Sequence, residues 1–310
     1  RLLSELDGLD WSDSLKAMQR EWIGRSEGAE IDFDVEGHPG ARIRVFTTRP
    51  DTLFGASFMV LSPEHPLVAT ITTAAQRDAV EAYQRTAAAK SELERTDLAK
   101  DKTGVFTGAY AHNPLFAPDD PRGRLPVWIA DYVIVTYGTG AIMAVPAGDE
   151  RDFAFARKFS LPVPGIFAPN SGDAERDAAI AAGERCCTDD VPFGPQNDNG
   201  SLSLHGLGMA AAKRRVIDWL EANGRGQPKV TYKLRDWLFS RQRYWGEPFP
   251  VLHTQDGVEL VPDDRLPVEL PHMDDFRPGG TPESPLSRAR EWVRTTDTKG
   301  RPPERKIKTM

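Results

Sequence analysis

The sequence predicts an α/β fold with a mixed, barrel-like β core, surrounding helices and an irregular C-terminal segment. Apolar and polar residues alternate in residues 31–35 and 43–45 on either side of a His-Pro-Gly turn, which is typical of a β-hairpin. Further short apolar runs are interspersed with segments of helical periodicity, and this mixture favours an α/β or α+β barrel-like core. Residues 279–310 are polar with little periodicity.

The individual elements follow from the spacing of apolar residues. Helical spacing predicts helices over residues 1–22, 70–96, 149–159 and 209–223, the last ended by Gly224. Short apolar runs predict strands over residues 105–107, 125–129 and 132–136, and residues 164–208 are expected to be rich in loops. Proline and glycine become frequent after Val230, which places a boundary near residues 225–233 and predicts three parts: 1–27, 28–228 and 229–310.

Composition limits the class of protein. The chain has 310 residues, 39% hydrophobic and 27% charged, as in a globular protein, and it has no apolar run of membrane-spanning length. It starts at Arg1 without a leader, so we expect a piece of a longer protein with no secretory signal. The only cysteines, Cys186 and Cys187, are adjacent and lack metal-binding spacing, which favours a reducing, cytoplasmic setting without a zinc site.

A net charge of −7 argues against a protein that coats nucleic acids, although a local basic patch stays open. The candidate clusters are Lys213, Arg214 and Arg215, and Arg235, Arg241 and Arg243. The first cluster can equally be the solvated face of a helix. The chain has no GxxxxGK[ST] phosphate loop, GxGxxG, GxSxG elbow or HExxH pair, so enzymes that depend on those motifs are unsupported.

Two segments about a hundred residues apart carry the most chemistry. Thr-Thr-Arg-Pro-Asp-Thr at residues 47–52 gathers hydroxyls around a proline that ends the strand, although threonine is also common in strands for packing reasons alone. In the second segment, Asp149 can cap the start of a helix, and Asp152 lies in the first turn of that helix. Asp152 shares a helix face with Phe155 and Phe159, and a carboxylate that faces inward needs hydrogen-bond donors or a cation. A ligand ammonium is one such cation.

These segments, residues 47–52 and 138–152, resemble the editing domain of bacterial leucyl-tRNA synthetases. The resemblance extends over about residues 1–270 through residues 22–28, 102–108, 128–132 and 235–246. It implies that residues 1–27 and 229–310 are catalytic-core segments flanking an editing domain at 28–228. The HIGH and KMSKS motifs of synthesis are absent, so aminoacylation by this chain is not expected.

The resemblance assigns roles to residues of both segments. Asp152 resembles the carboxylate that holds the substrate ammonium, and Thr47 and Thr48 resemble residues that position substrate or water. Arg49 resembles a supporting residue or a contact to the substrate carbonyl, and Thr52 resembles the residue whose bulk excludes leucine. The residues that resemble an adenosine cradle and its supports are Tyr137, Met143, Val145, Asp149 and Arg151. Where the family commonly has His and Gln, this chain has Gly148 and Glu150.

The resemblance therefore implies hydrolysis of tRNA(Leu) mischarged with isoleucine, valine, norvaline or methionine. The expected partners are the 3′ end of tRNA(Leu), with its terminal adenosine, and the non-cognate amino acid ester, handled by a cytoplasmic monomer without membrane contact. Editing needs no cofactor or metal, whereas the parent enzyme uses ATP and magnesium. The alternatives are a tRNA-end binding module impaired by Gly148 and an inert fragment. We expect orientation of water rather than a general base, because neither segment shows a base with a pKa near 7.

Overall fold

The computed structural model describes residues 1–90, 94–95, 102–134, 138–234, 241, 243–254, 256–277, 284–295 and 304–305. The chain divides into two compact units, Arg1–Leu234 and Arg235–Met310. The division falls after the predicted start of the third part at residue 229, because strand β7 (Gly226–Tyr232) pairs along β1 (Arg25–Val35) and so belongs to the first unit. Among the described residues, no helix has both the length and the apolar character needed to cross a membrane.

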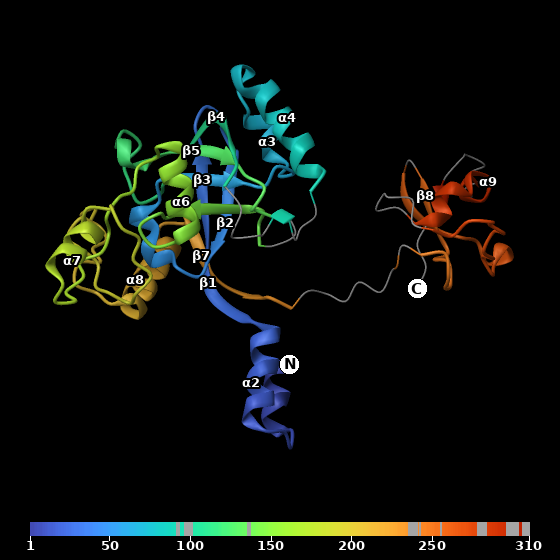
Figure 1. Cartoon of the computed structure of the whole chain (residues 1–310), viewed down its shortest axis with the longest axis horizontal. Coiled ribbons are helices and arrows are strands. Elements are labelled where there is room, and N and C mark those ends of the chain that lie inside the picture. Colours follow the sequence, from blue (N-terminus) through green and yellow to red (C-terminus); the bar gives the residue numbers. More distant parts are fainter. Residues whose placement is uncertain are drawn as a thin grey trace. The chain divides into compact units, whose positions relative to one another are not determined.

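The first unit is a curled mixed sheet surrounded by helices (Figure 1). Its strands run in the order β2-β1-β4-β5-β3-β6, with β7 on the remaining part of β1; β3 and β5 are parallel and the other pairs are antiparallel. The two end strands, β2 and β6, contact each other, which confirms the predicted barrel-like core. The remaining strands are β2 (Arg42–Thr47), β3 (Phe58–Leu61), β4 (Val105–His112), β5 (Arg124–Ile129) and β6 (Ala141–Ala144).

Helices and 3₁₀ turns connect and cover these strands. They are α1 (Leu2–Glu5), η1 (Leu6–Gly8), α2 (Asp13–Ile23), η2 (Pro50–Gly55), α3 (Leu67–Ile71), η3 (Ala74–Gln76), α4 (Arg77–Ala88), η4 (Pro121–Gly123), α6 (Glu150–Phe159), α7 (Ala174–Ala181) and α8 (Met209–Ala222). Helix α2 ends at Gly24, whose positive φ of 58° suits glycine, and the chain continues directly into β1. The predicted hairpin and the helices at 149–159 and 209–223 are confirmed.

Two sequence predictions about elements are wrong in the described residues. The helix expected from residue 70 begins at Arg77, because Thr72 and Thr73 break the pattern: the Thr72 hydroxyl donates to Val68 O at 2.6 Å, and Thr73 N donates to Thr107 O at 3.0 Å. Residues 132–134, expected in a strand, form a turn after β5; residues 135 and 136 lie outside the described part. Residues 164–208, expected to be rich in loops, contain helix α7 and otherwise mostly turns and irregular segments.

The core has two faces because side chains of β3 alternate. Met59 and Leu61 join the large cluster inside the barrel, while Phe58 and Val60 belong to a smaller cluster under α6. Phe58 stacks on Phe155 of α6, with ring centroids 5.2 Å apart. This packing fixes α6, and with it the start of that helix, against the sheet.

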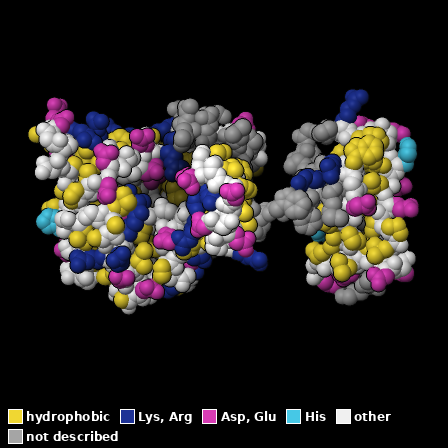
Figure 2. Space-filling model, turned by 90° about the horizontal axis from the view of Figure 1, so that it is seen from below, with side chains coloured by type: hydrophobic (Ala, Val, Ile, Leu, Met, Phe, Trp, Pro, Cys, Tyr) yellow, Lys and Arg dark blue, Asp and Glu magenta, His cyan; other side chains and the backbone are white. Residues whose placement is uncertain are grey.

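The surface of the first unit is a mixture of charges. In the view of Figure 2, lysine and arginine side chains are interspersed with aspartates and glutamates. Arg44 forms two bonds to Asp32, at 2.6 and 2.8 Å, and Asp34 accepts from Arg225 at 2.7 Å. Of the first basic cluster predicted, Arg214 and Arg215 are exposed on α8 and Arg215 donates to a backbone carbonyl, so both readings of that cluster stand.

The second unit contains a small antiparallel sheet, β10-β8-β9, and short helices. Its elements are β8 (Val251–Thr254), β9 (Gly257–Leu260), η5 (Asp263–Arg265), η6 (Pro285–Arg288), α9 (Arg290–Val293) and β10 (Glu304–Arg305). Tyr244, Trp245 and Phe276 pack together with ring centroids 4.5 to 5.2 Å apart. Of the second basic cluster predicted, Arg235 lies outside the described residues.

Candidate functional site

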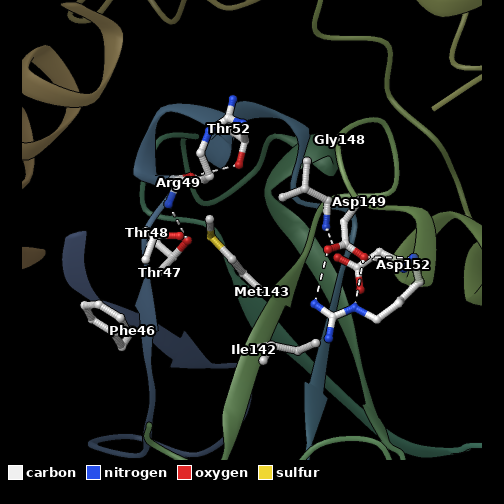
Figure 3. Close-up of a pocket in the computed structure, with 12 residues that line it drawn as sticks. Phe46, Thr47, Thr48, Arg49, Thr52, Ile142, Met143, Gly148, Asp149 and Asp152 are labelled. Atoms are coloured by element: carbon white, nitrogen blue, oxygen red, sulfur yellow. Dashed lines mark hydrogen bonds and ion pairs between the residues drawn. The ribbon is translucent and has the colours of Figure 1, made fainter. Parts of the chain in front are cut away.

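A cavity of about 270 Å³ lies where β2 ends and α6 begins. Figure 3 shows the threonine–arginine segment on one side and the two aspartates on the other, with Met143 between them. The lining residues are Phe46, Thr47, Thr48, Arg49, Thr52, Ile142, Met143, Val145, Gly148, Asp149, Arg151 and Asp152. The fold therefore brings two segments distant in sequence to one cavity.

All the predicted site residues line this cavity except Tyr137, which lies outside the described residues. Phe46 and Ile142 also line it and are missed by the sequence analysis. Each adjoins a predicted site residue in its strand, and strand alternation would send such neighbours to opposite faces. Ile142 does pack on the opposite side from Met143, against the cluster under α6, and still borders the cavity, so alternation along the strand gives no signal for it.

Arg49 is held in place by a buried carboxylate. Its Nε lies 3.0 Å from Asp51 Oδ2 and its Nη2 2.8 Å from the same oxygen, and Asp51 is fully buried. The Arg49 backbone N–H also donates to Thr47 Oγ1 at 3.0 Å. Two guanidinium N–H groups on one carboxylate oxygen form a charge-assisted pair, which fixes the guanidinium at the edge of the cavity. The sequence analysis gave Asp51 no such role, although its place two residues after Arg49 was visible.

The three threonines differ in what their hydroxyls do. Thr52 is buried and its Oγ1 donates to Arg49 O at 2.9 Å, so this hydroxyl is engaged with the backbone. Thr47 Oγ1 accepts from Arg49 N and keeps its own proton to donate. Thr48 is exposed and, in the part of the chain that is described, its hydroxyl has no hydrogen-bond partner. Thr48 is therefore the threonine most open to a ligand or a water.

Gly28 of β1 allows the Thr47 backbone to come close. A Cβ atom at Gly28 would lie 1.9 Å from Thr47 O and 3.0 Å from Thr48 Cα. Real Cβ atoms do not approach a carbonyl so closely, so any other residue would push the threonine segment away. The close approach of the Thr47 backbone to Gly28 thus fixes the position of one cavity wall.

Asp149 caps α6 and pairs with Arg151. Its Oδ1 accepts from the backbone N–H of Arg151 at 2.8 Å and of Asp152 at 3.1 Å, and its Oδ2 lies 3.2 Å from Arg151 Nη2. Burial alone would raise the pKa of Asp149, but the hydrogen bond from Arg151 and its charge outweigh burial and hold the pKa below its usual value. Arg151 is thereby committed to Asp149.

Asp152 is a buried carboxylate without an ion pair among the described residues. It is 6% exposed, and its Oδ2 accepts the Val145 backbone N–H at 2.8 Å. Burial, with repulsion from Asp149, raises the pKa of Asp152 to about 7. The sequence-based expectation that neither segment carries a group with a pKa near 7 is therefore wrong, because burial at the barrel wall cannot be read from a helix-start pattern.

Gly148 stands between this cavity and a second one of about 460 Å³. The second cavity is lined by Lys102, Gly148, Asp149, Glu150, Arg151, Ala154 and Thr188. A Cβ atom at Gly148 would meet Phe167 at 3.5 Å, an ordinary contact, and the backbone there is not left-handed. A Cβ atom is therefore accommodated at residue 148. Within the described residues, no three His, Cys, Asp or Glu side chains are grouped to hold a metal ion.

Two comparisons relate the chain to known proteins. The sequence model of the family described as leucyl-tRNA synthetase, editing domain, matches residues 20–221. The chain belongs to this family. It is also similar to a solved structure, the ternary complex of Agrobacterium radiobacter K84 agnB2 LeuRS with tRNA and LeuAMS, with 35% identity and a TM-score of 0.70.

That similarity covers all of this chain and 33% of the LeuRS chain, so the present chain spans about a third of its relative's length. The matched family segment contains both walls of the cavity. Membership of the editing-domain family confirms the predicted family and supports an editing-type role for the chain.

Proposed function

We propose that this cavity hydrolyses the ester bond of tRNA(Leu) that carries a non-cognate amino acid. The observation that carries the proposal is Asp152, a buried carboxylate at the cavity wall with one backbone donor and, among the described residues, no cation paired with it. Such a group is costly unless a cation joins it. The α-ammonium of an aminoacyl ester supplies one positive charge and three donors, and the solved relative is itself a complex with tRNA.

The opposite wall would orient the reaction. Water adds to the ester carbonyl carbon, the bond from that carbon to the ribose oxygen breaks, and the ribose oxygen takes up a proton, which leaves a free amino acid and tRNA. The Thr48 hydroxyl, which has no hydrogen-bond partner in the described part of the chain, and the free proton of Thr47 are suited to hold that water or a ribose hydroxyl. With the ammonium held across the cavity, orientation of the water supplies much of the rate enhancement. The reaction consumes water alone and draws on no cofactor.

Thr52 would exclude leucine from the cavity. Because its hydroxyl is bound to Arg49 O, Thr52 is held in one orientation and can act as a rigid obstacle. Selection by shape is needed here, since one methylene distinguishes substrates by only about 1–3 kcal/mol at a synthetic site. A second site with a different steric rule removes the errors that the first one admits.

The test is deacylation of Ile-tRNA(Leu) by the full chain. We expect turnover in the parent, its loss in Asp152→Ala, and its retention in the matched control Asp218→Asn, which removes an exposed carboxylate from α8 away from the cavity. Equal turnover in parent and Asp152→Ala would contradict the role of Asp152. Absence of turnover in the parent that Gly148→His restores would favour the impaired binding module. Absence in both would favour an inert fragment.

A further inference from the structure

Tyr132 carries a buried hydroxyl that the proposed mechanism leaves unused. It lies in the turn after β5, and its ring meets Phe155 of α6 edge-on, with centroids 6.0 Å apart at 65°. Its Oη is inaccessible to solvent and has no hydrogen-bond partner among the described residues. Buried hydroxyls are nearly always hydrogen-bonded, so this one calls for an explanation.

A second tyrosine of the same region shows that the fold can satisfy such a group. Tyr83 Oη lies 2.8 Å from Thr103 Oγ1 and accepts the backbone N–H of Asp131 at 3.0 Å. Tyr83 and Tyr132 thus flank the same turn, one with two partners and the other with none. A phenylalanine at residue 132 would pack its ring equally well against Phe155, so the hydroxyl serves no purpose in packing.

Asp152 can supply the hydrogen-bond acceptor that the Tyr132 hydroxyl lacks. It precedes Phe155 by one helical turn, and only its Oδ2 is bonded, to Val145 N; Oδ1 has no hydrogen-bond partner in the described residues. Burial raises the pKa of Tyr132 well above its ordinary value, and of the charged groups around it Asp152 adds most to this shift. A donor without an acceptor and an acceptor without a donor thus lie on the same side of α6.

We propose that the Tyr132 hydroxyl is the positioning group for Asp152, donating to its second carboxylate oxygen, directly or through one water, when Asp152 is ionised. Tyr132 then acts through Asp152 and does not itself touch the substrate. The inference rests on the proposed function only for its effect on hydrolysis. The bond holds the carboxylate in the orientation in which it receives the ammonium.

In the described residues, the other charged and titratable groups around Asp152 do not donate a hydrogen bond to its Oδ1. Asp149 repels it, Arg151 is paired with Asp149, and the Cys186 thiol is kept neutral because burial and nearby carboxylates raise its pKa to about 12. The Val145 N–H is already bound to the other oxygen. Tyr132 is therefore a buried side-chain donor that remains, within the described residues, for an ionised Asp152, and it is one whose own pKa the Asp152 charge raises.

The experiment compares Tyr132→Phe with the parent and with the control Tyr83→Phe. In each protein, carbon-13 NMR follows the carboxyl titration of labelled aspartates, with Asp152 assigned by its absence in Asp152→Asn. We expect Tyr132→Phe to raise the pKa of Asp152, to melt no lower than the parent below about pH 5, where Asp152 is protonated in the folded chain, and to deacylate Ile-tRNA(Leu) at least about tenfold more slowly. Tyr83→Phe should melt lower, because it loses two hydrogen bonds, and leave the Asp152 titration unchanged.

The readouts separate this inference from the proposed function. An unchanged Asp152 titration in Tyr132→Phe overturns the inference whether or not the parent hydrolyses ester. A raised pKa in a chain whose parent has no hydrolytic activity supports the positioning contact and contradicts the proposed function. A slower Tyr132→Phe that also melts lower, with the titration unmoved, would mean that the tyrosine is merely structural.

Discussion

Replacing Asp152 by asparagine should stabilise the folded chain increasingly as the pH rises. Burial raises the pKa of Asp152 from 3.8 to about 7, so the folded state binds its proton more tightly than the unfolded state does. For a group raised in this way, stability is complete below the unfolded pKa and declines as the pH rises towards the folded pKa. Because asparagine does not ionise, the free energy of unfolding of Asp152→Asn does not decline in this way as the pH rises.

The magnitude follows from the shift. A difference of about 3 pKa units corresponds to about 4 kcal/mol of free energy of unfolding above about pH 7. Between about pH 5 and pH 8 the difference in free energy of unfolding between Asp152→Asn and the parent should change by about 3 kcal/mol. Any fixed cost of burying the asparagine amide cancels, because only the change with pH is compared.

Urea unfolding at several pH values measures this quantity, since the free energy of unfolding extrapolates linearly to water. Asp149→Asn is the matched control at the same helix end. The pKa of Asp149 is lowered, so its carboxylate contributes stability above its unfolded pKa, and its loss should destabilise the chain at neutral pH. A difference between Asp152→Asn and the parent that stays constant with pH would refute the reasoning, because it would mean that Asp152 is not desolvated.

Two further predictions concern hydrolysis. Thr52→Ala should let the cavity accept leucine, so that correctly charged Leu-tRNA(Leu) is deacylated at a rate approaching that of Ile-tRNA(Leu); a variant that still spares Leu-tRNA(Leu) would show that Thr52 is not the obstacle. The kcat/KM of the parent should rise with pH through an inflection near pH 7, where Asp152 ionises in the free enzyme, and fall above about pH 8, where the free substrate's α-ammonium loses its proton. In the kcat profile this inflection should lie lower, because the bound ammonium favours the carboxylate; equal inflections would argue for a general base.

The sequence was sufficient where local chemistry decides the structure. The hairpin around residues 38–40 and the Asp149 cap were predicted because turn residues and capping residues act over a few positions. The helix start at Arg77 was missed, because Thr73 is held by a backbone bond to Thr107, a contact far along the chain. Local pattern carries no trace of such a contact.

Some properties of the candidate site were also predicted from the sequence, and others needed the fold. Its two walls were predicted from motif resemblance, and the described lining residues did meet at one cavity. Three properties needed the fold: the clamp of Asp51 on Arg49, the contact of Gly28 with Thr47, and the raised pKa of Asp152. Each depends on how deeply a group is buried or on which strand lies beside it.

The pairing of β1 with β7 brings together the two ends of the barrel segment, residues 25–232. Arg25 stands opposite Tyr232 in that antiparallel pair, so the chain comes into the barrel and leaves it on neighbouring strands. Paired residues in such a ladder have Cα atoms only about 5 Å apart. If the chain were cut at Arg25 and Tyr232, a short turn could join the two ends of the excised barrel segment. Every strand of the barrel would keep its neighbours. A segment built this way can be inserted into, or removed from, a host polypeptide without reordering the host's own chain path.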